Sequence, residues 1–524
     1  MTIAPARPST ETTSGAPRAI LRGAPASLVV VAGVCASFAA VPLVYLVIRA
    51  ADAGALELVE TLVRPRVVQL TLNTAALALA VTLTCLALGV ASAWILSRLR
   101  LPATRLLLIV SALPIAVPSY LAAYGWLVWV PSINGFWASW LVMSAVCTPY
   151  VTLPVAAALR STSTDLESVA RTLGRGPLAA FFIATWPRIR PAAVAGSLLV
   201  CLYTLSDFGL VSMLRFETLT WGINAAYGAS FDRNQAALLA LVLVALAFAV
   251  VAGERRSRSR VPASLTRTAS PLRAAGAWTI PAFGLVLLAP VAGVLVPVGG
   301  LVSRLVDAET VRAVDVPRLL AALGATIGLA AAGAAVSVLL ALPIAVLASR
   351  YRGRIAAAIE SVGVVGLALP GIVVGLSLVF FTLAVMPGFY QSALVLVFAY
   401  VVLFMPKAIG SMRTGLAAVP NTLSEVSRSL GQSPRATWLR VTARLTLPSV
   451  GIGALLVAIS IMKELPATLL LRPTGISTLA TELWSRTTVF EFGAAAPYAA
   501  ALVVVAAIPA VALSGIRGVA KEQL

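Results

Sequence analysis

Two carboxylates lie inside apolar stretches of this 524-residue chain, and they are the residues with the clearest potential for chemistry. Asp207 stands in the sequence LSDFGL, and Glu464 stands in MKELPA, 257 positions further on. Ionisable groups inside a membrane span are costly and usually face a cavity or a partner. Because carboxylate oxygens are hard donors, the two acids are candidates to line a path for a hard cation. The alternative is structural, with Lys463 forming an ion pair with Asp207.

Composition excludes most catalytic chemistry. The chain has no histidine, so it can hold neither an imidazole base nor a histidine-ligated metal centre. None of its three lysines stands in a P-loop, so it cannot hydrolyse a nucleotide in that manner. We expect no enzyme activity, no firm metal site and no bound cofactor, with any ATP and Mg used by partner subunits. The cysteines lack CxxC spacing and are predicted to be small buried hydrophobes: Cys35, Cys85, Cys147 and Cys201.

Membrane helices are the elements predicted to hold these residues. The chain is 60% hydrophobic and 11% charged, with a mean hydropathy of +0.97. Its apolar stretches are continuous and long enough for a ~30 Å hydrocarbon core, which indicates helices rather than a barrel. The sequence therefore predicts an all-α, polytopic membrane protein with about twelve transmembrane helices. The expected spans lie near 26–48, 69–96, 106–130, 136–157, 192–213, 235–252, 277–300, 319–348, 356–386, 391–411, 446–471 and 494–514.

Charge placement predicts the orientation of this bundle. Arginines gather in alternate loops, which the positive-inside rule places in the cytoplasm together with both termini. We therefore expect a multi-pass protein of the bacterial cytoplasmic (inner) membrane, with a disordered cytoplasmic tail at 1–25. The net charge of +20 then belongs to one membrane face, and attraction to anionic lipid explains it. No soluble basic domain remains to bind nucleic acid.

A polar loop occurs twice in the chain. The first copy, 165–191, reads DLESVARTLGRGPLAAFFIATWPRIRP, and the second, 422–448, reads TLSEVSRSLGQSPRATWLRVTARLTLP. At a spacing of 257 the residues that the copies share include Val169/Val426, Arg171/Arg428, Leu173/Leu430, Gly174/Gly431, Pro177/Pro434, Thr185/Thr442 and Pro191/Pro448. The same loop kept twice in a membrane protein suggests that it docks something twice.

The residue pattern of the loop predicts a helix, a corner and a second helix. Apolar residues at helical spacing precede Gly174, which permits a sharp turn; Pro177 suits a helix start, and Pro191 marks the return to the membrane. Such an element can present an apolar stripe to a groove in another subunit. The stripe would be flanked by arginines, which are Arg171 and Arg175 or Arg428 and Arg435. The alternative is an amphipathic helix lying on lipid headgroups.

Duplication extends beyond the loops. At a spacing of 252 the matched residues are Thr74/Thr326, Arg98/Arg350, Pro118/Pro370 and Pro154/Pro406. We expect a first half at 26–252, a basic cytoplasmic linker at 253–273 and a second half at 274–524. Parallel repeats of this kind place a substrate path at their interface, and each first helix is expected to precede a core of five spans.

With these residues in hand, the chain resembles the permeases of type I, MetI-like ATP-binding-cassette importers, in a form where two six-helix halves are fused. In that family the repeated loop is the coupling, or EAA, loop. The resemblance implies that two copies of an ATP-binding subunit dock at the cytoplasmic face and rock the halves between inward and outward openings. It also implies an extracytoplasmic substrate-binding protein, which the outer loops 214–234 and 472–493 are long enough to meet.

The coupling role passes by this resemblance to the matching loop residues, which are Glu167, Ala170, Arg171, Leu173, Gly174, Pro177, Glu425, Ser427, Arg428, Leu430, Gly431 and Pro434. The chain departs from the usual Glu-Ala-Ala pattern, because its glutamate shifts by one residue between the copies, from Glu167 to Glu425. The docking role of the two acids is therefore less secure than that of the glycines.

The residues around the membrane carboxylates resemble the ferric iron group of fused permeases. The stretches are LSDFGLVSMLR, 205–215, and MKELPATLLLRP, 462–473. The resemblance thus implies ferric iron, with Asp207, Glu464 and Lys463 as candidates for the translocation path. Thiamine, sulfonate, phosphonate or polyamine remain alternatives for the same machinery, as does an ion-coupled secondary carrier.

Overall fold

The computed structural model describes residues 24–53, 60–162, 165–228, 233–257, 273–274, 276–307 and 314–522. Within these ranges nine helices are long and apolar enough to cross a membrane. A tenth span is formed if Thr104–Ala116 and Ser119–Trp129, bent by 94°, are taken together, and two shorter apolar helices lie at Gly371–Val385 and Phe492–Ile508. The all-α polytopic fold is confirmed, but two predicted spans are not single straight helices: 106–130 is bent by 94°, and 356–386 is divided between α18 (Arg354–Gly363) and α19 (Gly371–Val385). The predicted tail and linker lie mostly outside the described residues.

The first half consists of helices joined by short turns. In chain order its elements are α1 (Ala26–Ala53), α3 (Pro65–Arg98), α4 (Thr104–Ala112), η1 (Leu113–Ala116), α5 (Ser119–Trp129), α6 (Gly135–Cys147), α7 (Pro149–Arg160), α8 (Asp165–Thr172), α9 (Pro177–Ala180), η2 (Phe181–Thr185), α10 (Trp186–Ser206), α11 (Gly209–Met213), α12 (Leu219–Gly228) and α13 (Arg233–Ser257).

The second half repeats this order. Its elements are η3 (Gly276–Trp278), α14 (Thr279–Pro290), η4 (Val291–Leu295), α15 (Val296–Leu305), α17 (Val316–Arg350), α18 (Arg354–Gly363), η5 (Val365–Ala368), α19 (Gly371–Val385), η6 (Pro387–Phe389), α20 (Ala393–Ala418), α21 (Asn421–Ser429), α22 (Pro434–Thr437), η7 (Trp438–Ala443), α23 (Arg444–Met462), α24 (Pro466–Leu471), α25 (Leu479–Thr488) and α26 (Phe492–Glu522).

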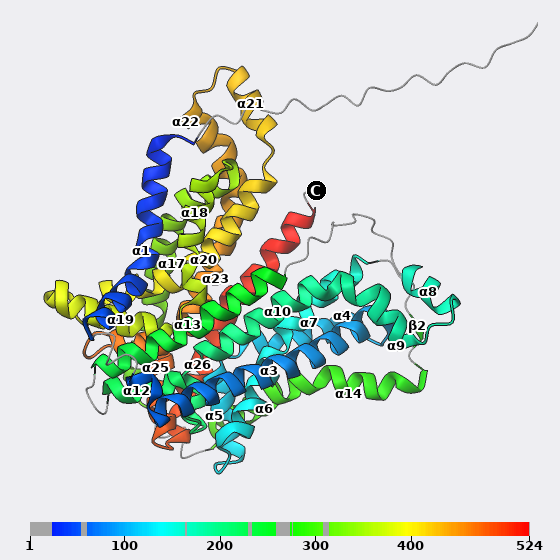
Figure 1. Cartoon of the computed structure of the whole chain (residues 1–524), viewed down its shortest axis with the longest axis horizontal. Coiled ribbons are helices and arrows are strands. Elements are labelled where there is room, and N and C mark those ends of the chain that lie inside the picture. Colours follow the sequence, from blue (N-terminus) through cyan, green and yellow to red (C-terminus); the bar gives the residue numbers. More distant parts are fainter. Residues whose placement is uncertain are drawn as a thin grey trace, which may run out of the picture.

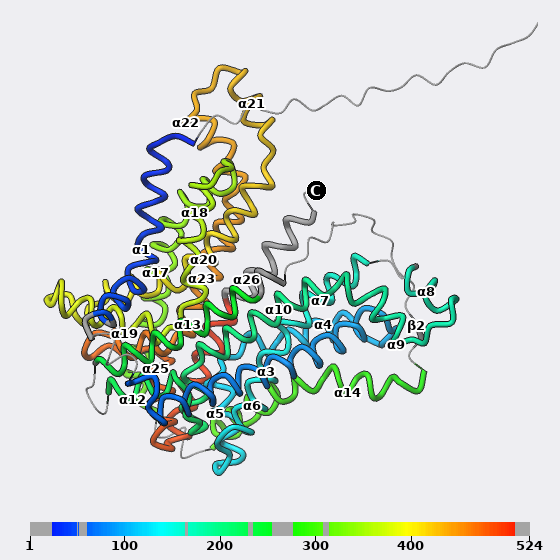
Figure 2. The backbone as a smooth tube through the Cα atoms, in the orientation of Figure 1, coloured from blue at the N-terminus to red at the C-terminus, as the bar shows by residue number. Residues whose placement is uncertain are grey.

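Two arms diverge from a common region, as Figure 1 shows. The first arm holds α3, α4, α7 and α10 and ends at α8 and α9, whereas the second holds α17, α18, α20 and α23 and ends at α21 and α22. The backbone trace in Figure 2 follows both arms to these tips. The repeated loops therefore occupy equivalent places, one at the tip of each arm.

The first helix of each half precedes the other helices of that half in the chain and also packs against the opposite half. Helix α1 contacts α17, α18 and α19, and α15 contacts α5. Aromatic pairs join α1 to its neighbours, with ring centroids 5.9 Å apart for Phe38 and Phe398. On the opposite side Trp126 Nε1 donates to the Ala292 carbonyl at 2.9 Å, within the π-helical turn η4. The exchange of first helices ties the arms together.

The membrane segments after the repeated loops differ from the predicted ones at both ends. A continuous apolar helix runs from Pro177 to Ser206 in the first half and from Pro434 to Met462 in the second, so Pro191 and Pro448 lie inside these helices and not at their starts. Each helix then breaks before a short one, α11 or α24. The predicted spans 192–213 and 446–471 are therefore broken at their ends, because a capped turn interrupts each apolar run.

A two-residue parallel pairing joins β1 (Leu99–Arg100) to β2 (Arg273–Ala274) at the end of α3. Buried apolar side chains form two large clusters, and each draws residues from both halves. One combines α1 and α13 with the second arm, and the other combines the first arm with α25 and α26. Each of these two cores is therefore shared between the halves.

Candidate functional site

The first repeated loop has the predicted helix, corner and second helix. Helix α8 ends at Thr172, and Gly174 follows with a positive φ of 79°. The Gly174 amide donates to the Arg171 carbonyl at 3.1 Å, and the Arg175 amide donates to the Ala170 carbonyl at 3.1 Å. This pair of bonds is the Schellman motif, which satisfies the last carbonyls of a helix and favours glycine at the left-handed position. Pro177 then begins α9.

The second loop has the same geometry. Gly431 follows α21 with a φ of 82°. Its amide donates to the Arg428 carbonyl at 2.9 Å, and the Gln432 amide donates to the Ser427 carbonyl at 3.2 Å. Pro434 begins α22, and the Ser433 hydroxyl accepts from the Ala436 amide to cap it. The two loops therefore form corners of the same geometry from different sequences.

Both loops expose a matched apolar stripe. Leu166, Val169 and Leu173 are 48%, 51% and 76% exposed, and their counterparts Leu423, Val426 and Leu430 are 43%, 56% and 76% exposed. The flanking arginines are exposed as well, and these are Arg171, Arg175, Arg428 and Arg435. The stripe is what the sequence pattern predicted, and its side chains have no cover within the described part of the chain. Exposed apolar patches ringed by charge commonly mark an interaction surface.

The two loop glutamates occupy different environments. Glu167 is 5% exposed and accepts from Thr185 Oγ1 at 3.3 Å, so it lies against the helix that leaves the loop. Glu425 is exposed. A one-residue shift turns a side chain by about 100° around a helix, which explains the difference. In the second loop Ser427 instead lies buried against Thr437, with their hydroxyl oxygens 3.1 Å apart.

Each loop leads into the membrane through a π-helical turn. The turns η2 (Phe181–Thr185) and η7 (Trp438–Ala443) begin 257 residues apart. Such turns insert an extra residue into an α-helix and are frequent at functional sites. The loops are thus joined to α10 and α23 by a continuous but locally widened helix.

Asp207 lies in the break after α10, and not within a helix as predicted. Its Oδ1 accepts from the amides of Leu210 at 3.0 Å and Val211 at 3.4 Å, and its Oδ2 accepts from the Ser119 hydroxyl. The side chain is buried, and Thr220 Oγ1 donates to its carbonyl at 2.7 Å. Asp207 therefore caps the first turn of α11 while holding α5 against the bend.

Glu464 lies in the equivalent break after α23. Its Oε1 accepts from the Ala467 amide at 3.1 Å, in the first turn of α24, and Thr468 Oγ1 donates to its carbonyl at 2.9 Å. The side chain is half-buried. Gly371, 252 residues after Ser119, faces it so closely that a Cβ there would overlap Glu464 Oε1. In the second half, Glu464 therefore takes the place of Asp207, and Gly371 takes the place of Ser119.

The lysines near this bend have other partners than the one considered from the sequence. Lys463 Nζ donates to the Ile115 carbonyl in η1 of the first half at 3.2 Å, whereas Asp207 has the contacts above. Lys407 Nζ donates to Ser460 Oγ at 2.5 Å and lies over the Phe404 ring. The structure therefore brings Lys463 and Glu464 to the junction of the halves without pairing Lys463 with Asp207.

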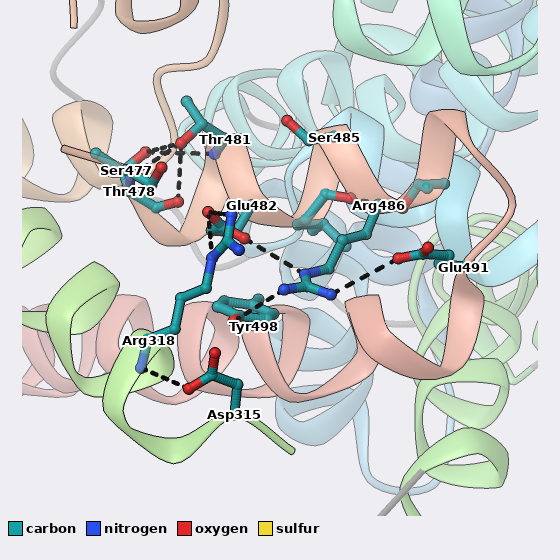
Figure 3. Close-up of polar contacts among 12 residues, drawn as sticks. Asp315, Arg318, Ser477, Thr478, Thr481, Glu482, Ser485, Arg486, Glu491 and Tyr498 are labelled. Atoms are coloured by element: carbon teal, nitrogen blue, oxygen red, sulfur yellow. Dashed lines mark hydrogen bonds and ion pairs between the residues drawn. The ribbon is translucent and has the colours of Figure 1, made fainter. Parts of the chain in front are cut away.

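Near the junction of the arms, two arginines 252 residues apart hold carboxylates. Arg66 Nη2 lies 2.6 Å from Glu217 Oε1 in an exposed pair, which lowers the pKa of Glu217. Arg318 lies 2.9 Å from Glu482, which is 3% exposed and also contacts Arg486 at 3.3 Å. Figure 3 shows Glu482 between these two arginines and Tyr498 beside Arg486. A cavity of about 680 Å³, lined by Arg318 and Glu482 among others, opens beside them.

Two pairs of residues in these contacts were not predicted as site residues. The spacing of 252 matches Ser119 with Gly371 and Arg66 with Arg318. This spacing is the only signal that the sequence offers for them, because none of the four belongs to a motif. Within the described residues no group of three or more His, Cys, Asp or Glu side chains could hold a metal ion.

Comparison with known proteins agrees with this arrangement. The family profile described as "Binding-protein-dependent transport system inner membrane component" matches residues 66–253 and 337–519. The Fe(3+)-transport system permease protein FbpB 2 of Haemophilus influenzae is 31% identical over 474 residues, which cover 89% of this chain and 94% of that protein.

Other relatives cover one part of the chain. The molybdenum transport system permease protein ModB of Mycobacterium tuberculosis is 30% identical over 237 residues, 41% of this chain and 88% of that protein. The putrescine transport system permease protein PotI of Escherichia coli is 33% identical over 113 residues, 20% of this chain and 39% of that protein. Because the family profile matches twice and covers more than half of the residues, this chain belongs to the inner membrane components of binding-protein-dependent transport systems.

Proposed function

We propose that this chain supplies both permease halves of an ATP-binding-cassette importer for ferric iron, with two ATP-binding subunits docked on its two loops. The matched apolar stripes carry the docking part of the proposal. A helix that lay on headgroups would bury its leucines in lipid, and nothing would require the same glycine corner twice. A groove in a soluble partner requires a rigid, projecting element, which is what each arm tip presents (Figure 1).

The proposed orientation follows from charge. The loops at the arm tips are rich in arginine, so they and both termini lie in the cytoplasm. The segments between α11 and α12 and between α24 and α25 are then extracytoplasmic and meet the two lobes of a substrate-binding protein. None of the three lysines stands in a P-loop sequence, so this proposal assigns the binding of ATP with Mg to the partner subunits.

Transport in this proposal is alternating access driven from the tips. ATP closes the partner subunits and draws the two loops together, and each loop moves the helix that continues from it, α10 or α23. The arms pivot where their first helices are exchanged, so closing the tips opens the opposite end toward the binding protein. Hydrolysis returns the arms to the diverging arrangement seen in Figure 1.

The substrate assignment is supported by the ferric-iron permease relative, whose similarity extends through both halves. The proposed path runs between the halves past Glu464 and Lys463, which reach the junction, while Asp207 supports the path by holding its bend. In this proposal iron is the transported substrate and not a cofactor of the chain.

Reconstitution tests the whole proposal. The chain is placed in vesicles with the ATP-binding subunit and the substrate-binding protein from neighbouring genes, and uptake of radioactive ferric iron is measured with and without ATP. ATP-dependent uptake that unlabelled ferric iron reduces, and that putrescine, molybdate, sulfate and thiamine do not, is expected. Uptake driven by an ion gradient without the ATP-binding subunit would contradict the importer assignment, and competition by another solute would contradict iron.

Loop variants test the coupling step. Gly174→Pro and Gly431→Pro remove an amide donor and impose a negative φ at a corner that needs a positive one, at a cost of about 1–3 kcal/mol each. Uptake per ATP hydrolysed should fall about tenfold or more. The matched control is Gly176→Ala, two residues away in open space with an ordinary φ, which should transport normally. Full coupling in both proline variants would argue against docking through the corners.

A further inference from the structure

The last residues of the two longest described helices make the same contact. Arg98 ends α3, and Arg350 ends α17, 252 residues later. Arg98 Nη2 donates to the Thr162 carbonyl at 3.2 Å, and Arg350 Nη1 donates to the Val419 carbonyl at 3.2 Å. Both carbonyls lie just before a repeated loop. Arg350 also donates to the side chain of Asn421, the first residue of α21.

This contact survives a change in the length of the chain. The arginines are 252 residues apart, but Thr162 and Val419 are 257 residues apart. The second half therefore carries five extra residues between its arginine and its acceptor, and the bond still forms at an equal distance. A contact that depended only on local sequence would have shifted with the insertion.

Physical chemistry explains why an arginine suits this position. Val419 directly follows the last residue of α20, and Thr162 lies two residues beyond the end of α7, so both carbonyls lie near the negative, C-terminal end of a helix dipole. A guanidinium supplies charged donors that stay ionised even where water is scarce. Arg98 is only 5% exposed, and Arg350 is half-buried. Removal of either guanidinium takes away a charged donor beside the start of a loop.

The neighbouring arginines show that a positive charge in this region does not by itself produce the contact. Arg100 and Arg352 lie two residues further on and share the spacing of 252, but both are exposed. The chain thus provides, in each half, one arginine turned inward onto the loop and one turned outward.

We propose that Arg98 and Arg350 are positioning residues that tether the start of each coupling loop to α3 and α17. The end of each loop is already joined to α10 or α23 by continuous helix, so the tether gives every loop a second attachment. A loop held at one point can swivel when its partner closes, whereas a loop held at both ends transfers its displacement to two long helices at once. This inference rests on the proposed coupling function.

The transport test uses methionine, which keeps the unbranched stem and removes the donors. Arg98→Met with Arg350→Met should lower uptake per ATP at least about fivefold, the lower end of typical coupling effects, while the ATP-binding subunits still co-purify. The matched control is Arg100→Met with Arg352→Met. Unchanged coupling in the first pair, or an equal fall in the control pair, would overturn the tether.

A second measurement needs no transport and separates the tether from the proposed function. Spin labels are placed at the exposed residues Ser429 on α21 and Leu339 on α17, after alanine replaces the four native cysteines. Arg350→Met in the purified chain should broaden the distance distribution between the labels, and Arg352→Met should not. An unchanged distribution in Arg350→Met would overturn the tether, even if transport of iron were also absent.

Discussion

The two halves of this protein build the same bend from different residues. In the first half a short acid, Asp207, reaches its helix with a serine hydroxyl beside it; in the second a longer acid, Glu464, fills the space that a glycine leaves open. In each carboxylate one oxygen accepts from an amide in the first turn of the short helix that follows. Both halves therefore keep a helix break capped by an acid. They differ in how the space is filled: Asp207 is short and lies beside a serine, whereas Glu464 is longer and lies beside a glycine.

A similar division appears at the arginines Arg66 and Arg318. Their positions match, but Glu217 comes from the segment before α12, whereas Glu482 comes from within α25. The first pair is exposed, and the second carboxylate is buried with Arg486 as an additional partner. Equivalent positions in a duplicated protein therefore need not contribute equally to stability, and substitutions in the two halves can measure the difference.

The largest expected difference lies between Glu482 and Glu217. Glu482→Gln leaves Arg486 without its buried acid and should cost about 3 kcal/mol, near the lower end for breaking a buried pair, because Arg318 is partly exposed and can be solvated. Glu217→Gln removes an exposed pair and should cost less than about 1 kcal/mol. Melting temperatures of the detergent-purified variants measure the contrast.

Glu491→Gln provides the control within the same cluster. Its carboxylate lies 3.7 Å from Arg486 and is 58% exposed, so its loss should resemble that of Glu217. If Glu482 and Glu217 variants melted at the same temperature, the burial of the second-half pair would carry no stability, and the contrast between the halves would fail.

An exchange of the bend residues should give an intermediate effect. Gly371→Ser alone pushes the Glu464 carboxylate off the Ala467 amide and should cost about 1–2 kcal/mol, the range for a lost helix cap. Adding Glu464→Asp shortens the acid and recreates the pair of the first half, so the double variant should recover most of this loss. Melting temperature and ATP-dependent uptake of the single and double variants complete a double-mutant cycle.

The reciprocal exchange in the first half is the matched control. Asp207→Glu alone should be unfavourable because Ser119 occupies the space, and Ser119→Gly should relieve it. Additive effects in both cycles would mean that each acid and the residue facing it do not compete for the same space, and the comparison of the two bends would fail.

Much of this architecture follows from the sequence, and the exceptions have physical causes. The corner of each loop could be predicted, because Gly174 and Gly431 follow a helix at the position where the backbone must adopt a positive φ. The exchange of first helices was not, because an apolar helix can face lipid or protein equally well. The break at Glu464 had a signal in Pro466, which disfavours helix at the preceding residue. The only sequence signal for the break at Asp207 was the acid itself. The apolar residues on both sides of it form a continuous pattern, which predicted an unbroken helix.

The smallest expected effect separates the two loop glutamates. Glu167→Ala removes the acceptor of Thr185 between the loop and its exit helix, and it should lower stability by about 1 kcal/mol. Glu425→Ala lies on an exposed face and should change stability by less than about 0.5 kcal/mol. If Glu425 instead meets the ATP-binding subunit directly, its loss weakens co-purification at an unchanged melting temperature. Thermal melting and subunit binding, measured on both variants, thus distinguish an acid that shapes its loop from one that docks. Equal behaviour of the two would show that the one-residue shift has no structural consequence.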